Sequence, residues 1–298
     1  MESFIINEKC STLRMLGREA LRGRWKLGLG AFVLYGVALY VPYGILVTLF
    51  ANTPFISSVY SLLVSGPLTL GLAIFVLRLF RNDEPGAFQI FYGFERFGKS
   101  LGMYLLICLF IFLWYLIVIP GLIIASIKPF FMPFVLLLAA PAIIAAIRYS
   151  QAFFILADHP ETGAMECISI SKRIMAGNKW KYAKLLLSFI GWAIIASIPL
   201  SAVGGITATR VLGNMTMEIG ASMNQMQIYE KFMSALLSPG TLALMYIASV
   251  GYLVLYVYVM STLAAFYEMA SGNLRPGYVA STAEIVDESH PKNIDNIE

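Results

Sequence analysis

The segment GFERFGKS at residues 93–100 is the stretch that most resembles a catalytic motif. It satisfies the phosphate-loop pattern G-x-x-x-x-G-K-[ST], in which backbone amides and a lysine hold nucleotide phosphates. Such a loop joins a strand to a soluble helix, whereas this segment follows the aromatic GAFQIFYGF and enters the apolar LGMYLLICLFIFLW. Phe94 and Phe97 are also bulky for so tight a loop. We therefore expect a membrane-entry helix with Lys99 among lipid headgroups, and no nucleotide site.

Acid–base chemistry has one set of candidate residues, Asp158, His159 and Glu161. They are adjacent residues at an expected helix start, without a nucleophile or a closed pocket nearby. The centres of the apolar runs contain no Asp, Glu, Lys, Arg or His, which proton-coupled pumps and intramembrane enzymes require. We expect no catalytic residues and no enzymatic activity.

A methionine-rich segment at residues 214–233 raises the question of copper binding. Its candidate ligands have M-x-M and M-x-x-M spacings, and thioethers suit monovalent copper; they are Met215, Met217, Met223 and Met226. Methionine is equally suited to flexible apolar packing on a short amphipathic helix. Because no His or Cys accompanies them, we favour packing and keep the four as weak candidates.

Cysteine and histidine give no stronger metal site. Cys10, Cys108 and Cys167 are odd in number and widely separated, which argues against a disulfide framework and against zinc spacing. His159 and His290 lack a companion of the HExxH type. We expect neither a metal nor another cofactor.

The segment at residues 155–187 is polar between two apolar runs. Asp158 and Pro160 predict the start of an amphipathic helix and Gly177 predicts its end. On its polar side and in the basic stretch that follows lie the residues expected to contact a partner or lipid headgroups: Glu166, Lys172, Arg173, Lys179, Trp180, Lys181 and Lys184. The pattern permits anchoring at the membrane surface as well as docking of a cytoplasmic partner, and basic and aromatic residues at a span entrance need no partner to explain them.

Composition places these segments in an integral membrane protein. Of 298 residues, 59% are hydrophobic and 13% charged, and the mean hydropathy is +0.76. Spans of about 20 residues are expected in an all-α, polytopic helix bundle. Six apolar runs fit, at 27–50, 59–80, 101–127, 130–148, 185–208 and 241–266. The break at 126–130 is either a turn outside the membrane, which we favour, or a re-entrant kink.

Basic residues predict the orientation. With the N-terminus inside, only Lys128, Arg210 and Lys231 of the 21 lysines and arginines lie outside, and the other 18 lie in the cytoplasm. The net charge of +4 is thus a topological signal and not a reason to invoke nucleic acid. Residues 1–26 predict a basic amphipathic helix on anionic lipid, 27–270 the six-span domain, and 271–298 a flexible acidic cytoplasmic tail.

Prolines inside the apolar runs free carbonyls and bend helices. They are Pro42, Pro67, Pro120, Pro133, Pro141 and Pro199. Kinked, closely packed helices can enclose a cavity for a lipid or hydrophobic peptide, although they are also ordinary membrane architecture.

The stretches LGREALRGRWKLG, YGFERFGKSLGMYLL and ILADHPETGAMECISISKRIMAGNKWKYAKLLLSFIGW carry a family resemblance. Together they resemble an uncharacterised bacterial integral-membrane family, the domain of unknown function 975, over most of residues 10–200, more weakly in the last span. The resemblance implies a multi-span protein of the bacterial cytoplasmic membrane and supplies no activity. The apolar run from Lys128 to Ile147 looks longer than the family's usual connection.

Three classes of function remain. We expect a non-enzymatic component for export, envelope maintenance or antimicrobial-peptide resistance. It would contact membrane lipids and dock another membrane protein or a transporter ATPase through the helix at 158–184. The alternative is a transporter or flippase for a lipid or small hydrophobic molecule, and an intramembrane enzyme is a distant third.

Overall fold

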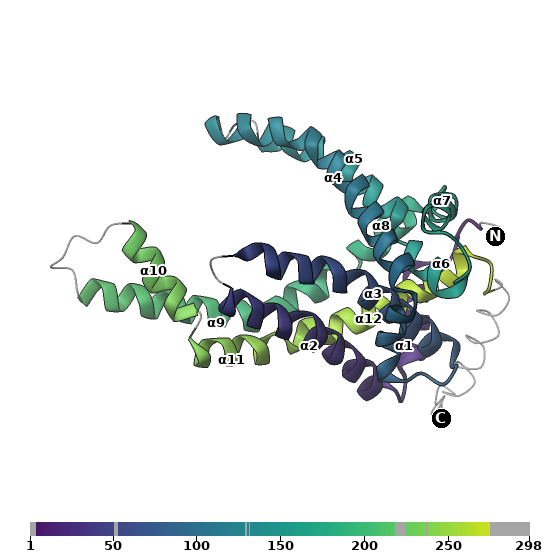
Figure 1. Cartoon of the computed structure of the whole chain (residues 1–298), viewed down its shortest axis with the longest axis horizontal. Helices are drawn as coiled ribbons and strands as arrows, with labels where there is room; N and C mark the ends of the chain where they lie inside the picture. The colour runs from purple at the N-terminus through teal and green to yellow at the C-terminus, as the bar shows by residue number, and fades with distance from the viewer. Residues whose placement is uncertain are drawn as a thin grey trace, which may run out of the picture.

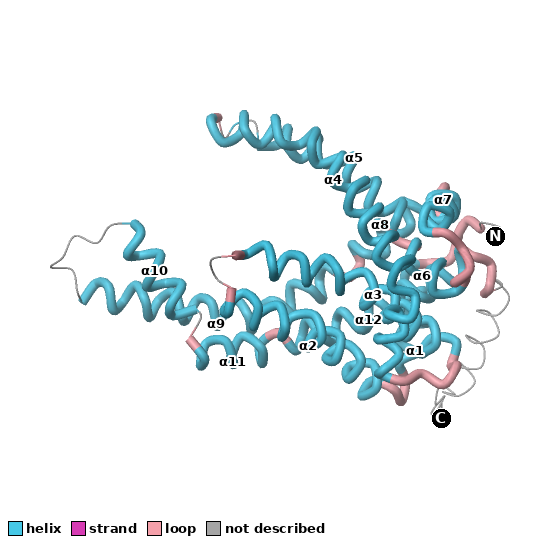
Figure 2. Tube along the Cα trace, in the orientation of Figure 1, coloured by secondary structure: helices cyan, strands magenta, loops and turns pink. Residues whose placement is uncertain are grey.

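The computed structural model describes residues 4–50, 53–128, 130, 132–217, 225–236 and 238–274. These residues form helices and connecting turns with no strand among them (Figures 1 and 2). The elements are α1 (Cys10–Leu21), α2 (Trp25–Leu49), α3 (Pro54–Arg81), the 3-10 helix η1 (Ala87–Arg96), α4 (Phe97–Ile127), α5 (Met132–Tyr149), α6 (Ala152–Asp158), α7 (Ala164–Ile174), α8 (Lys179–Leu187), α9 (Ile190–Met217), α10 (Gln225–Leu236), α11 (Pro239–Ala248) and α12 (Val250–Ala270).

Six helical segments among the described residues are long and apolar enough to cross a membrane, so the chain is an all-α, multi-pass membrane protein as predicted. The expected spans correspond to α2, α3, α4, α5, α9 and the pair α11–α12. The last span differs because the helix is interrupted at Ser249, which separates α11 from α12. Residues 275–298, most of the expected tail, lie outside the described residues.

The connection near residue 128 is a turn. The helix α4 ends at Ile127 and α5 begins at Met132, and the two run side by side as a hairpin (Figure 1). A Cβ atom at Gly121 would lie 2.6 Å from Leu138 Cδ1, so the two helices are in close contact. A re-entrant kink of a single helix is therefore excluded.

One end of the bundle contains most of the buried side chains, and we call it the core end. There, α1, α6, α7 and α8 surround the last turns of α3 and α12, at the right of Figure 1. In α3, 72% of the most apolar stretch is buried, against at most 18% in the other five spans. The helix α3 is therefore the central element, and the other spans face mainly outward.

The 3-10 helix η1 packs on α3 more closely than any side chain would allow. A Cβ atom at Gly71 would lie 1.7 Å from the carbonyl oxygen of Ile90, and one at Gly93 would lie 1.9 Å from that of Pro67. Only glycine permits this backbone contact. The apparent phosphate loop thus begins in a segment bound tightly to α3.

The amphipathic helix predicted near the N-terminus is α1, but its apolar face was expected on lipid and lies instead on protein. Leu13, Leu16 and Leu21 are buried. Ser261 Oγ donates a hydrogen bond to the Gly17 carbonyl at 2.8 Å. A Cβ atom at Gly17 would lie 2.5 Å from Thr262 Oγ1. The reason is steric. Because Gly17 has no side chain, α1 contacts the α12 backbone directly, and lipid chains cannot pack against α1 as closely.

The residues before α1 form a strap across the core end. The Phe4 amide donates to the Ala270 carbonyl at 3.0 Å. Asn178 is 1% exposed, and its side chain accepts from the Ile6 amide at 2.9 Å and donates to the Phe4 carbonyl at 2.8 Å. The start of the described chain is thereby tied to the α7–α8 turn and to the end of α12.

The α4–α5 hairpin diverges from the other spans as it extends away from the core end (Figure 2). Beyond the core end its large side chains are exposed, as Leu113, Ile123 and Ile143 illustrate. At 1.5 Å per residue, the 31 residues of α4 span about 46 Å, more than the apolar thickness of a bilayer. The exposed apolar surface of the hairpin is suited to lipid contact.

Candidate functional site

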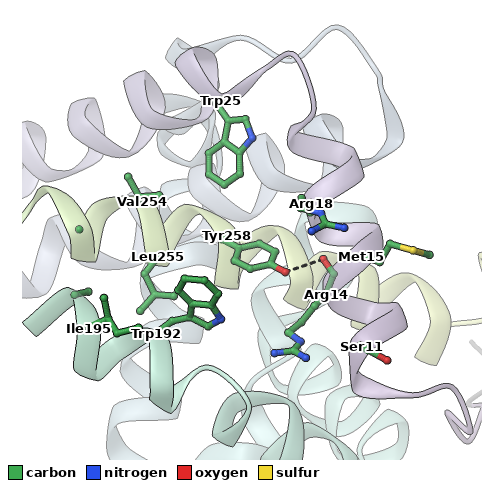
Figure 3. Close-up of a pocket in the computed structure, with 12 residues that line it drawn as sticks. Ser11, Arg14, Met15, Arg18, Trp25, Trp192, Ile195, Val254, Leu255 and Tyr258 are labelled. Atoms are coloured by element: carbon green, nitrogen blue, oxygen red, sulfur yellow. Dashed lines mark hydrogen bonds between the residues drawn. The ribbon is translucent and has the colours of Figure 1, made fainter. Parts of the chain in front are cut away.

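A groove with a volume of about 650 Å³ lies beside α1. It lies between α1, the start of α2, the first turns of α9 and the middle of α12 (Figure 3). Its lining comprises Ser11, Arg14, Met15, Arg18, Trp25, Trp192, Ile195, Ala196, Gly251, Val254, Leu255 and Tyr258. A volume of this size is typical of small-molecule sites. None of the six prolines expected to shape a cavity lines it.

The wall of the groove is apolar and belongs to two spans. Ile195 from α9, with Val254 and Leu255 from α12, supplies branched aliphatic side chains. At the base, a Cβ atom at Gly251 would lie 3.4 Å from Ala196 Cα, so small residues allow the two helices to touch there. The spans close the bottom of the groove and leave its wall accessible to an aliphatic chain.

Two tryptophans frame this wall. Figure 3 shows Trp25 and Trp192 on either side of the α12 segment that carries Leu255 and Tyr258. The Trp192 side chain is 57% exposed although it lines the groove. Tryptophan is enriched at membrane–water interfaces because its ring is apolar and its N–H is polar. The two rings therefore give the mouth of the groove side chains typical of a membrane interface.

The rim of the groove is basic. Ser11, Arg14, Met15 and Arg18 line it from α1, at the i, i+3, i+4 and i+7 spacing of one helix face. The lining contains these two arginines and no carboxylate. Among the described residues, neither arginine forms an ion pair. The groove therefore combines an apolar wall with an uncompensated positive rim.

The helix α1 is held rigidly in this position. The Tyr258 hydroxyl donates to the Arg14 carbonyl at 3.1 Å, the bond drawn in Figure 3. Arg14 Nη1 donates to the Ser188 carbonyl at 3.3 Å, which directs the guanidinium toward the start of α9. Phe189 stacks edge-on against the Tyr258 ring, with 5.2 Å between centroids. The basic rim is thus preorganised and does not depend on a ligand for its geometry.

The residues considered for catalysis belong to a separate ionic cluster. Asp158 Oδ1 accepts from Arg81 Nη1 at 2.6 Å and Oδ2 accepts from the Tyr267 hydroxyl at 2.9 Å. Arg81 also pairs with Glu268 Oε1 at 2.7 Å. Asp158 is the last residue of α6, so its expected place at a helix start is wrong. The cluster connects α3, α6 and α12.

The other two candidate catalytic residues lie near the surface beside this cluster. His159 Nδ1 is 3.5 Å from Glu161 Oε1, and both side chains are exposed. His159 Nε2 is 3.8 Å from Asp158 Oδ2. The arrangement presents no nucleophile among the residues within these distances.

The expected amphipathic helix is shorter than predicted. It is α7, which begins at Ala164 and is followed by Gly177 in a left-handed conformation with φ of 87°, as the predicted stop requires. Glu166 and Arg173 are exposed on one face, while Ile168 and Ser171 are buried on the other. The two faces are as predicted, and the apolar one is part of the core.

The seven predicted docking residues differ in whether their side chains are exposed or already contact other parts of the protein. Lys172 Nζ lies over the rings of Phe110 and Tyr149, 5.6 and 5.5 Å from their centroids, and Lys181 Nζ donates to the Asn7 carbonyl at 3.5 Å. Lys179 is half-buried. The exposed members are Glu166, Arg173, Trp180 and Lys184.

Lys99, the lysine of the apparent phosphate loop, was expected among lipid headgroups and instead binds protein. Its ammonium donates to the carbonyls of Pro160 and Glu161 at 2.7 and 2.9 Å. The segment before it is η1 and not a strand, so the structure offers no phosphate loop here.

The buried thiol of Cys167 is unsuited to reaction, and the described residues contain no cluster placed to hold a metal ion. Cys167 is buried, and this burial raises the pKa of its thiol to about 11, so it is protonated at neutral pH. No group of three His, Cys, Asp or Glu side chains in the described ranges is placed to hold a metal ion. Met215 and Met217 fall in the last turn of α9 and Met226 in α10 with its side chain exposed, whereas Met223 lies outside the described residues.

A family model described as "Protein of unknown function (DUF975)" matches residues 8–273. The match extends beyond the 10–200 range of the sequence resemblance and includes α12, which supplies one wall of the groove. No curated protein and no solved structure matches the chain.

Proposed function

Since the chain belongs to the DUF975 family, a multi-pass membrane family without an assigned activity, we propose from the groove itself that it is a non-enzymatic protein that binds a lipid-class amphiphile. The observation that carries this proposal is the cavity of about 650 Å³ with an apolar wall, two interfacial tryptophans and a basic rim. An amphiphile satisfies both parts of the groove, whereas a purely apolar molecule leaves the arginines without a partner.

The role is binding and carriage of the amphiphile rather than its chemical conversion. No side chain in the lining is a nucleophile activated by a neighbouring base, since the lining contains Ser11 but no histidine and no carboxylate. We place the groove and the N-terminus on the cytoplasmic side, in accordance with the distribution of basic residues.

The test is retention of lipid by groove-filling variants. Ile195→Trp adds bulk at an exposed position of the groove wall, and Ile198→Trp, equally exposed on α9 but outside the lining, is the matched control. Native mass spectrometry of the purified proteins should show bound lipid lost from the first variant and retained by the control. Equal retention by both variants, at unchanged thermal stability, would contradict the proposal.

Docking of a partner protein is a second function, favoured by one observation: Trp180 is 76% exposed beside the basic residues of α8. A large exposed aromatic residue with arginine or lysine nearby is typical of interface anchors. The test combines Trp180→Ala with Arg173→Glu, because Lys172 is engaged by aromatic rings and its reversal would disturb packing. Unchanged recovery of co-purifying membrane proteins would remove the basis for docking.

A further inference from the structure

The rim of the groove identifies which kind of lipid it takes. We propose that the groove is a site for a phospholipid with a net anionic headgroup, whose phosphate is bound by Arg14 and Arg18. This inference rests on the proposed function, because the headgroup can be selected only if the groove holds a lipid. It adds the chemical class of the ligand and the residues that recognise it.

Charge is the first argument. Arg14 and Arg18 are the charged residues of the lining, and no carboxylate lines the groove to neutralise them. A guanidinium donates paired hydrogen bonds that match the geometry of a phosphate. A zwitterionic headgroup would bring its ammonium close to the same two arginines, and like charges repel. The rim therefore favours a headgroup that carries a phosphate and no compensating cation.

Position is the second argument. The basic rim lies on α1, and the apolar wall lies beside it on α9 and α12 (Figure 3). A phospholipid has the same order of parts, with the phosphate at the interface and the acyl chains deeper. The wall formed by Ile195, Val254 and Leu255 gives one acyl chain an apolar path from the rim. A free phosphate ion would leave that wall unused.

Rigidity is the third argument, and it separates a site from a basic surface. Basic helices attract anionic lipids without forming a site, because the attraction needs only charge. Here α1 is fixed through its backbone, by Tyr258 at the Arg14 carbonyl and by Ser261 at the Gly17 carbonyl. Arg22 and Lys26 are close in sequence, exposed, and outside the lining. A site-specific headgroup effect must therefore depend on Arg14 and Arg18 and not on Arg22 and Lys26.

The experiment measures lipid preference of the full chain in nanodiscs made from equal amounts of phosphatidylglycerol and phosphatidylcholine. Lipid retained after detergent extraction is counted by native mass spectrometry. Wild type should retain phosphatidylglycerol in preference by about tenfold, because both lipids carry the phosphate and only phosphatidylcholine brings an ammonium close to the two arginines. Arg14→Gln with Arg18→Gln should reduce the preference to less than about twofold, as expected when the guanidinium contact is lost.

The control variant carries Arg22→Gln with Lys26→Gln, which removes the same charge from the same region. It should keep the wild-type preference. Equal loss of preference in both double variants would overturn the site and leave only general attraction to a basic surface. Folding is checked by thermal unfolding, since Arg14→Gln also removes one hydrogen bond to Ser188.

Two further arms separate the possible failures. If Ile195→Trp expels both lipids but wild type shows no preference between them, the groove binds lipid and the headgroup inference is wrong. If Ile195→Trp changes nothing, both proposals fail. If inorganic phosphate or glycerol phosphate shifts the thermal midpoint as much as phosphatidylglycerol does, the ligand is a soluble phosphate and the assignment to a lipid is overturned.

Discussion

The core end and the far halves of the spans bury their apolar side chains in different surroundings. At the core end, Leu21, Phe75 and Tyr267 are fully enclosed by protein. Along the far halves, Leu113, Ile123 and Ile206 remain more than half exposed, and in a membrane their neighbours are acyl chains. The core end therefore folds as a soluble domain does, by removing apolar surface from water, whereas the remainder depends on the bilayer. The groove lies where these two regions meet.

The sharpest test of this comparison is overpacking at the core end. Gly71→Ala places a methyl group 1.7 Å from the Ile90 carbonyl oxygen, so η1 must move away from α3. We expect a loss of stability at or above the upper end of the roughly 1–3 kcal/mol typical of overpacked sites. Thermal unfolding in detergent measures it. The control is Gly98→Ala, which meets nothing within 4 Å and should leave the midpoint unchanged or slightly raised.

The next effect in size is expected at the ionic cluster. Arg81→Gln leaves Glu268, whose side chain is 4% exposed, without its cationic partner. We expect a loss on the order of 2 kcal/mol, below the value for fully buried pairs because the Arg81 side chain is 37% exposed. Arg22→Gln is the control, since its pair with Glu19 is solvent-exposed and should matter by less than about 0.5 kcal/mol. Equal effects would show that the cluster is not structural.

A smaller effect is expected at the strap. Asn178→Ala removes the acceptor of the Ile6 amide and the donor to the Phe4 carbonyl. We expect a loss of roughly 1–2 kcal/mol, because buried backbone groups are left without partners. Limited proteolysis should then cleave between the strap and α1 faster than in the wild type. An unchanged cleavage rate would mean that Asn178 does not hold the strap.

The smallest effect is expected in the far half of α9. Ile206 is 53% exposed, so Ile206→Ala exposes little that was buried by protein. Its contribution to stability in detergent should be below about 0.5 kcal/mol, as for surface positions. A loss above about 1 kcal/mol would show protein packing that the exposure does not indicate, and it would weaken the comparison of the two regions.

The sequence predicted the spans well because hydropathy is a local property. Each of the six apolar runs corresponds to helical structure, and the face of α7 that carries Glu166 and Arg173 was also identified correctly. The features that the sequence did not predict depend on contacts between residues far apart in the chain. Arg81 and Glu268 are 187 residues apart, so no spacing rule connects them. The break at Ser249 has no proline to mark it.

The groove could not be predicted from the sequence for a related reason. Arg14 and Arg18 belong to the basic amphipathic helix that was predicted within residues 1–26 and expected to lie on anionic lipid. The position of α1 against α12 depends on Gly17, because only a residue without a side chain lets the α12 backbone come so close at Thr262. A single glycine in a helical sequence does not predict a contact of this kind. Trp25 and Trp192 likewise gave no sequence signal beyond the general preference of tryptophan for membrane interfaces.

The contact between α1 and α12 has a consequence for biosynthesis. Gly17 and Ser261 are 244 residues apart, so at 5–20 residues per second the ribosome needs roughly 12–50 s to make the second after the first. During that interval α1 lacks α12, the helix it contacts most, and the bilayer surface is the nearest apolar phase for the face left open. The nascent helix therefore rests on lipid first and exchanges it for α12 when the last span is inserted.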